Sequence, residues 1–135
     1  MMRELLKAEL IADEGVVLKP YKCTAGRTTI GIGRNLDDVG ISRDEALRLL
    51  ESDIDRVEKD LDRELPWWRG RPDNVQRAMA NQCFQLGING LLKFKNMLSC
   101  LHAGDYEGAK RHGLDSEWAK QTPARAKRVT DLFVP

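Results

Sequence analysis

EGVVLKPYKCTAGRTTIGIG, residues 14 to 33, spans a change from helical to extended chain. Before it, apolar residues recur at helical spacing over residues 3–12, and this pattern stops near Gly15. Within it, β-branched residues favour extended backbone, while Pro20 and several glycines interrupt it. These features predict a small, irregular antiparallel sheet of three short strands, within a lobe of residues 13–40.

A long helix is predicted next, over residues 42–65, with the sequence SRDEALRLLESDIDRVEKDLDREL. Ser42 and Glu45 have the spacing of a capping box, and the apolar residues that follow recur every three or four positions. The other faces are densely charged, which is typical of a helix that packs on one side and faces water on the others. We expect this helix to connect a small β-containing lobe with a larger helical lobe.

After one predicted loop, PWWRGRPD at residues 66–73, the rest of the chain reads as helical. Apolar periodicity and stop signals predict helices over 73–86, 91–101, 105–112 and 116–120, and a last one after Thr122 and Pro123. The predicted fold class is therefore α+β, mostly α, in a single domain of residues 1–135. We expect residues 1–12 to join residues 66–135 in the helical lobe.

Composition favours a soluble globular protein, with 41% hydrophobic residues, 32% charged residues and a net charge of +1. This charge gives no reason to expect nucleic acid as a partner, and no stretch approaches the roughly 18 apolar residues of a membrane span. Glu4 and Glu9 interrupt the apolar region of any signal peptide, so we expect neither a signal peptide nor membrane insertion. The three cysteines lack the spacing of a disulfide framework or a metal site, and we expect no metal and no cofactor.

Glu14 is the first candidate for chemistry. A carboxylic acid held partly out of water at a helix end acquires a raised pKa and can donate a proton near neutral pH. The extended segment after it would direct Cys23 and Thr29 toward the same cleft. A lone acid at a helix end is more often structural, so spacing alone leaves both interpretations open.

The run DEGVVLKPYKCTAGRTTIGIGRNL, residues 13–36, resembles the active-site segment of the bacteriophage lysozyme family of the T-even type. The shared pattern is Glu-Gly, Leu-x-x-Tyr, an acid or cysteine, and Gly-x-x-Thr-Ile-Gly-x-Gly. Arg34 departs from the histidine that commonly follows the last glycine. NQCFQLG at 81–87 and WAKQTPARAKRV at 118–129, with Phe133 after it, resemble two further segments of the family. The resemblance implies the family's two-lobed fold, in agreement with the predicted elements.

By this resemblance the chain is an endolysin-type muramidase. Such an enzyme hydrolyses the β-1,4 bond between N-acetylmuramic acid and N-acetylglucosamine in bacterial peptidoglycan and lyses the host cell. The resemblance implies that Glu14 is the general acid, that Cys23 occupies the place of the second catalytic residue, and that Thr29 helps to position water. It also implies four residues that bind substrate or support the acid: Asn35, Phe84 and Gln85 for binding, and Arg125 for support.

The sequence leaves several roles open for Cys23. It is a thiolate that attacks the anomeric carbon or orients water, a neutral lining residue beside Glu14 and Thr29, or a cysteine that only fills space. For the whole protein, the competing interpretations are a lytic transglycosylase and a non-catalytic wall-binding or virion protein. We expect a monomer that stays in the host cytoplasm until its release to the cell wall, and the resemblance implies a holin-like partner for that release.

Overall fold

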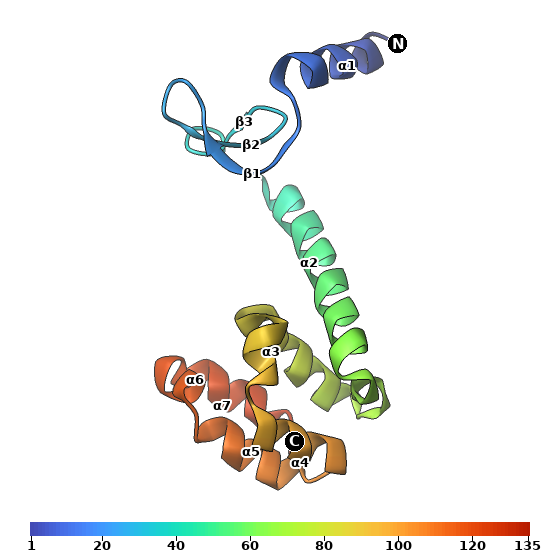
Figure 1. Cartoon of the computed structure of the whole chain (residues 1–135), viewed down its shortest axis with the longest axis vertical. Coiled ribbons are helices and arrows are strands. Elements are labelled where there is room, and N and C mark those ends of the chain that lie inside the picture. The colour runs from blue at the N-terminus through green and yellow to red at the C-terminus, as the bar shows by residue number, and fades with distance from the viewer. The chain divides into compact units, whose positions relative to one another are not determined.

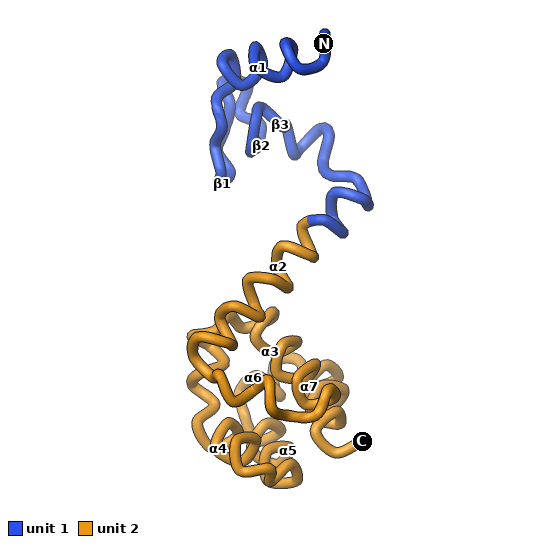
Figure 2. The backbone as a smooth tube through the Cα atoms, turned by 90° about the vertical axis from the view of Figure 1, so that its right-hand side faces the viewer, with its two compact units in different colours: residues 1–48 blue, residues 49–135 orange.

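The computed structural model describes residues 1–135 and divides them into two compact units, residues 1–48 and 49–135 (Figure 2). The N-terminal unit contains one helix, a three-stranded sheet and the beginning of a second helix. The C-terminal unit contains the rest of that helix and the remaining helices. None of the helices combines the length and the apolar character that crossing a membrane requires. The predicted class, α+β with mostly α structure, is confirmed.

The first helix, α1, spans Met2–Glu14 and ends at Gly15, whose φ of 72° lies in the region that favours glycine. The antiparallel sheet follows in the order β1-β2-β3, with strands at Val17–Lys22, Thr28–Gly31 and Arg34–Asn35 (Figure 1). The predicted three-stranded sheet is thus confirmed. No residue of α1 is buried, and the expectation that residues 1–12 join the helical lobe stays a prediction.

The long helix α2, Arg43–Glu64, begins with the predicted capping box. The hydroxyl oxygen of Ser42 accepts a hydrogen bond from the N–H of Glu45 at 3.1 Å, and the Glu45 carboxylate accepts one from the N–H of Ser42 at 2.9 Å. Two donors that a helix start would otherwise leave unpaired are therefore satisfied. The second half of α2 buries Val57 and Leu61 in the core of the C-terminal unit.

The C-terminal unit consists of helices and contains no strand (Figure 1). Their buried apolar side chains form one core. The elements of this unit after α2 are η1 at Pro66–Gly70, α3 at Asp73–Leu92, α4 at Lys95–Ala103, α5 at Tyr106–Leu114, α6 at Glu117–Gln121 and α7 at Pro123–Asp131. α4 packs against α5, and both α5 and α6 pack against α7. Four of the large side chains at the centre are almost completely buried: Leu61, Met79, Leu101 and Phe133.

The predicted loop at residues 66–73 is in fact a 3-10 helix over Pro66–Gly70. Trp68 within it is only 2% exposed, and its indole N–H donates to the Asp62 carboxylate at 2.7 Å. Arg69 stacks its guanidinium over the same indole at 4.4 Å from the ring centroid. Burial of the indole therefore organises a segment whose proline and glycine predicted only irregular chain.

The predicted end of a helix at Gly87 is confirmed, whereas the predicted start of the next long helix at residue 91 is wrong. Gly87 has a non-helical φ of 74° and ψ of 163°, but the chain resumes helical geometry and continues to Leu92. The next helix consequently begins at Lys95 and not at residue 91. Thr122 precedes α7 as predicted, although its hydroxyl donates to the Trp118 carbonyl oxygen at 3.0 Å and does not cap α7.

Candidate active site

Cys23 and Thr29 lie close together at the end of the β1–β2 hairpin. Tyr21 pairs with Thr29 across the two strands, and Cys23 follows two residues after Tyr21, so both side chains project from one face. A tight turn closes the hairpin. In it the Gly26 N–H donates to the Cys23 carbonyl oxygen at 2.8 Å, and the Cys23 N–H donates to the Arg27 carbonyl oxygen at 2.9 Å. The turn therefore fixes the position of the thiol.

This turn directs main-chain N–H groups toward the Cys23 sulfur. Hydrogen bonds from the N–H groups of Arg27 and Ala25 favour the thiolate and lower the pKa of Cys23, and partial burial opposes them without cancelling their effect. A hydrogen bond from the Thr29 hydroxyl contributes less to lowering this pKa. That hydroxyl has one proton, which it donates in the structure to the Arg27 carbonyl oxygen at 3.0 Å. The main-chain groups are therefore the chief cause of the lowered pKa.

The pKa values of the other two cysteines are raised, in contrast to that of Cys23. Burial raises the pKa of Cys83, which lies in the core of the C-terminal unit, and it also raises the pKa of Cys100. Asp105 raises the pKa of Cys100 further, through its negative charge and a hydrogen bond. Cys23 is thus the thiol that ionises most readily in this chain.

Glu14 is the last residue of α1, and its carboxylate lies against Gly33 in the turn between β2 and β3. Gly33 has a φ of 71°, and a Cβ atom placed on it would stand 2.7 Å from Oε2 of Glu14. The Glu14 side chain is exposed, and no hydrogen bond holds its carboxylate within the N-terminal unit. The partial burial expected for this acid is therefore not present inside its own unit.

Asn35 lies in β3, where it pairs with Thr29 across the strands. Both ends of its carboxamide contact Asp38: the amide nitrogen donates to the carboxylate at 2.9 Å, and the amide oxygen accepts from the Asp38 N–H at 3.1 Å. These contacts order the turn that leads toward α2. A role of Asn35 in substrate binding stays a prediction.

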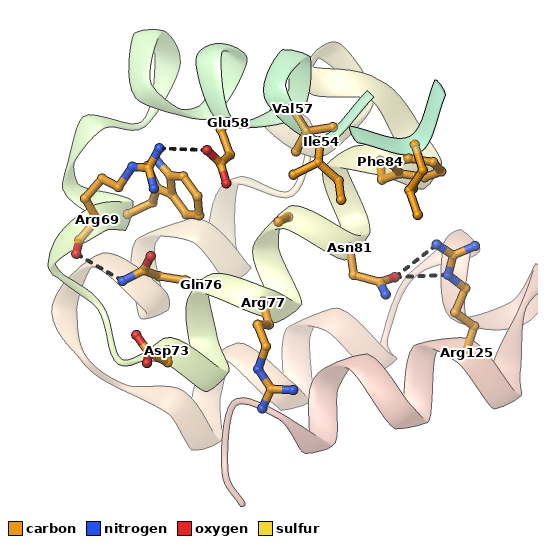
Figure 3. A pocket seen from close by; sticks show the side chains of 13 residues that line it. Ile54, Val57, Glu58, Arg69, Asp73, Gln76, Arg77, Asn81, Phe84 and Arg125 are labelled. Atoms are coloured by element: carbon orange, nitrogen blue, oxygen red, sulfur yellow. Dashed lines mark hydrogen bonds and ion pairs between the residues drawn. The ribbon is translucent and has the colours of Figure 1, made fainter. Parts of the chain in front are cut away.

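The other residues implied by the resemblance lie in the C-terminal unit. Phe84 is 45% exposed and, with Asn81 and Arg125, lines an open hollow of about 700 Å³ (Figure 3). Nε and Nη2 of Arg125 donate to Oδ1 of Asn81 at 3.1 and 3.0 Å. Gln85 accepts a hydrogen bond from the Trp118 indole at 2.8 Å, which joins α3 to α6. The binding roles of Phe84 and Gln85, and the support of Glu14 by Arg125, stay predictions.

Arg34 and Glu45 form an ion pair that sequence reasoning missed. Nη2 and Nη1 of Arg34 donate to the two carboxylate oxygens of Glu45 at 2.8 and 3.1 Å, and Nη1 also donates to the Gly40 carbonyl oxygen at 3.0 Å. The Arg34 hydrogen bonds, followed by that from the Ser42 N–H, lower the pKa of Glu45 to about 2. The capping box had located Glu45, but nothing in the local pattern linked it to Arg34.

Comparison with known protein families matches residues 12–132 to the model for phage lysozymes. This chain belongs to the phage lysozyme family. The match includes the helix end that presents Glu14 and the hairpin that carries Cys23 and Thr29. The resemblance stated from the sequence motifs is therefore confirmed, and it supports a lysozyme-type glycosidase.

Three relatives of this phage lysozyme family member come from different organisms and differ in length. The pre-baseplate central spike protein Gp5 of Enterobacteria phage T4 is 34% identical over 98% of this chain, which spans only 27% of the spike protein's length. A probable T4-type lysozyme 2 of Dictyostelium discoideum is 28% identical over 95% of the chain and 92% of its own length. An endolysin of Acyrthosiphon pisum secondary endosymbiont phage 1 is 32% identical over 79% of the chain and 72% of its own length.

Proposed function

We propose that this chain is a muramidase that hydrolyses the β-1,4 bond between N-acetylmuramic acid and N-acetylglucosamine in bacterial peptidoglycan. The observation that carries the proposal is that one unit holds the three residues of the family motif. Glu14 lies at a helix end, and Cys23 and Thr29 share one face of the adjoining hairpin. The lowered pKa of Cys23 supports the proposal, because it increases the share of negatively charged thiolate where an aspartate is otherwise expected.

In the proposed reaction, Glu14 donates its proton to the glycosidic oxygen as the bond from that oxygen to the anomeric carbon breaks. The anomeric carbon then carries positive charge in an oxocarbenium-like transition state. The Cys23 thiolate stabilises this charge, either by attacking the carbon or by orienting a water molecule with Thr29. If the thiolate attacks, the carbon–sulfur bond that it forms breaks again when water attacks the anomeric carbon and the sulfur leaves as thiolate. In both routes water supplies the new hydroxyl group, and the proton that water loses restores the acid form of Glu14.

The test of this proposal compares wild type with Glu14→Gln, which keeps the size of the side chain but removes its proton. Glu9→Gln is the matched control, because it makes the same change on the same exposed helix. Wild type and Glu9→Gln should reduce the turbidity of purified peptidoglycan, whereas Glu14→Gln should sediment with it and leave it intact. Equal clearing by all three proteins would refute the proposed role of Glu14. Sedimentation of all three without clearing would favour a non-catalytic wall-binding protein.

A second candidate concerns where the enzyme acts. The similarity to a spike protein covers 98% of this chain but only 27% of the spike protein's length. As the alternative to a free endolysin, we therefore propose that this domain works as part of a virion. Peptide mass spectrometry of purified phage particles tests this alternative. Peptides of this domain in intact particles would support it, and peptides found only in the soluble lysate would support the free endolysin.

A further inference from the structure

The orientation of Glu14 depends on a close approach to main chain. Its Oε2, Cδ and Cγ atoms lie 2.7, 2.9 and 3.1 Å from the place where a Cβ atom of residue 33 would stand. Carbon atoms in favourable contact are roughly 3.5–4.0 Å from their neighbours, so any side chain at this position must displace the carboxylate. The obstructed atoms are the far end of a flexible side chain, and the displacement therefore changes the orientation of Glu14 more than the fold.

The residue that follows Gly33 forms an ion pair that holds the end of this turn. Arg34 follows Gly33 directly and places its guanidinium between the Gly40 carbonyl oxygen and the Glu45 carboxylate. Glu45 in turn is held in the first turn of α2 by its capping box with Ser42. Pairs of this kind fix direction as well as distance, because the planar guanidinium meets both oxygens of the carboxylate.

We propose that Gly33, Arg34 and Glu45 are positioning residues for Glu14. Gly33 provides the surface against which the carboxylate rests, and the Arg34–Glu45 pair holds that surface relative to α2. This inference rests on the proposed role of Glu14 as general acid. It predicts that the geometry of the acid is sensitive to two residues, Arg34 and Glu45, that form no hydrogen bond or ion pair with it.

Gly33→Ala and Gly31→Ala form a matched pair of variants. Gly33 lies in the β2–β3 turn with a φ of 71°, and Gly31 is the last residue of β2 with a φ of 73°, so alanine meets similar backbone strain at each. A Cβ atom at residue 31 has no neighbour within 4 Å, whereas one at residue 33 meets Glu14. The direct readout is the side-chain carboxyl carbon signal of Glu14 in nuclear magnetic resonance spectra of the whole chain, assigned through its loss in Glu14→Gln.

We expect Gly33→Ala to shift the Glu14 signal, and Gly31→Ala to leave it near that of wild type. On peptidoglycan, Gly33→Ala should lower kcat by about 100-fold with a smaller effect on KM, because a misplacement of about 1 Å has that cost. Gly31→Ala should remain within about threefold of wild type at a temperature where it is folded. Equal shifts of the Glu14 signal in the two variants would overturn the role of Gly33.

The second arm uses Glu45→Gln, which keeps a side chain able to cap the helix but removes the charge that binds Arg34. Asp44→Asn is its control, since it removes one charge from the same helical turn and Asp44 forms no ion pair. Glu45→Gln should move the Glu14 signal in the same direction as Gly33→Ala, and Asp44→Asn should not. An unchanged Glu14 signal in folded Glu45→Gln would overturn the role of the ion pair.

The two readouts separate this inference from the proposed function. If wild type does not cleave peptidoglycan, the proposed function fails while the carboxyl signal still reports whether Gly33 and Glu45 position Glu14. If wild type cleaves peptidoglycan but the signal is the same in all folded variants, the positioning inference fails and the proposed function stands. A Gly33→Ala chain that does not fold leaves the Glu45→Gln comparison to decide the matter.

Discussion

Replacement of Cys23 by aspartate should change how activity depends on pH. An unperturbed thiol has a pKa of about 8.5, so at pH 7 about 3% of it is thiolate. Replacing such a thiol by a group that is fully ionised at pH 7 can raise the rate by at most about 30-fold. The N–H groups of Arg27 and Ala25 lower the pKa of Cys23, so its thiolate share is larger and the gain is smaller than this limit. An aspartate, with an ordinary pKa near 3.9, is already ionised throughout the neutral range.

The assay measures initial rates of release of labelled peptidoglycan from pH 5 to 9 for wild type, Cys23→Asp and Cys23→Ser. The ratio of Cys23→Asp to wild type should fall as pH rises through the pKa of Cys23 and then level off. Cys23→Ser should be poorly active at every pH, because a hydroxyl group stays neutral. A ratio that does not vary with pH, or full activity of Cys23→Ser, would refute the thiolate role.

Three further predictions follow from individual contacts. Cys23 should react with iodoacetamide at lower pH than Cys83 and Cys100, whose pKa values are raised, and peptide mass spectrometry measures this order. Folding lowers the pKa of Glu45 from about 4.5 to about 2, so its carboxylate should stabilise the fold above pH 4.5 and lose this effect as pH falls toward 2. The free energy of unfolding, measured with denaturant, should therefore depend less on pH in Glu45→Gln than in wild type across this window. Gln82→Met should raise the free energy of unfolding by about 1–2 kcal/mol, because the fully buried Gln82 carbonyl oxygen has no hydrogen-bond partner, and an unchanged or lower value contradicts this.

The sequence predicted correctly those helices and strands whose ends are determined by residues close to one another in the chain. The capping box of Ser42 and Glu45 starts α2 one residue after Ser42, and Gly15 ends α1. Similarly, the predicted β-segment contains the three strands because its β-branched residues and glycines act within a few positions of one another. The motif that includes Glu14 and Thr29 carried the family assignment in the same way.

The features that sequence missed depend on contacts between distant parts of the chain or on the conformation of one glycine. The sequence marks Arg34 only as a departure from histidine, because its partner Glu45 lies eleven positions away across a loop. The contact of Glu14 with Gly33 joins a helix end to a strand turn, and no periodicity reports it. Gly87 interrupts the helix as its residue type predicts, but the sequence did not predict that helical geometry resumes after it and continues to Leu92.

The most direct test of the central claim is mass spectrometry of the fragments that wild type releases from purified peptidoglycan in water enriched in heavy oxygen. A muramidase should leave each new reducing end on N-acetylmuramic acid, with one heavy oxygen atom at the anomeric carbon. Glu14→Gln should release none of these fragments. Fragments that are lighter by one water and carry no heavy oxygen would identify a transglycosylase, and the absence of any fragment from wild type would contradict the proposed catalysis by Glu14 and Cys23.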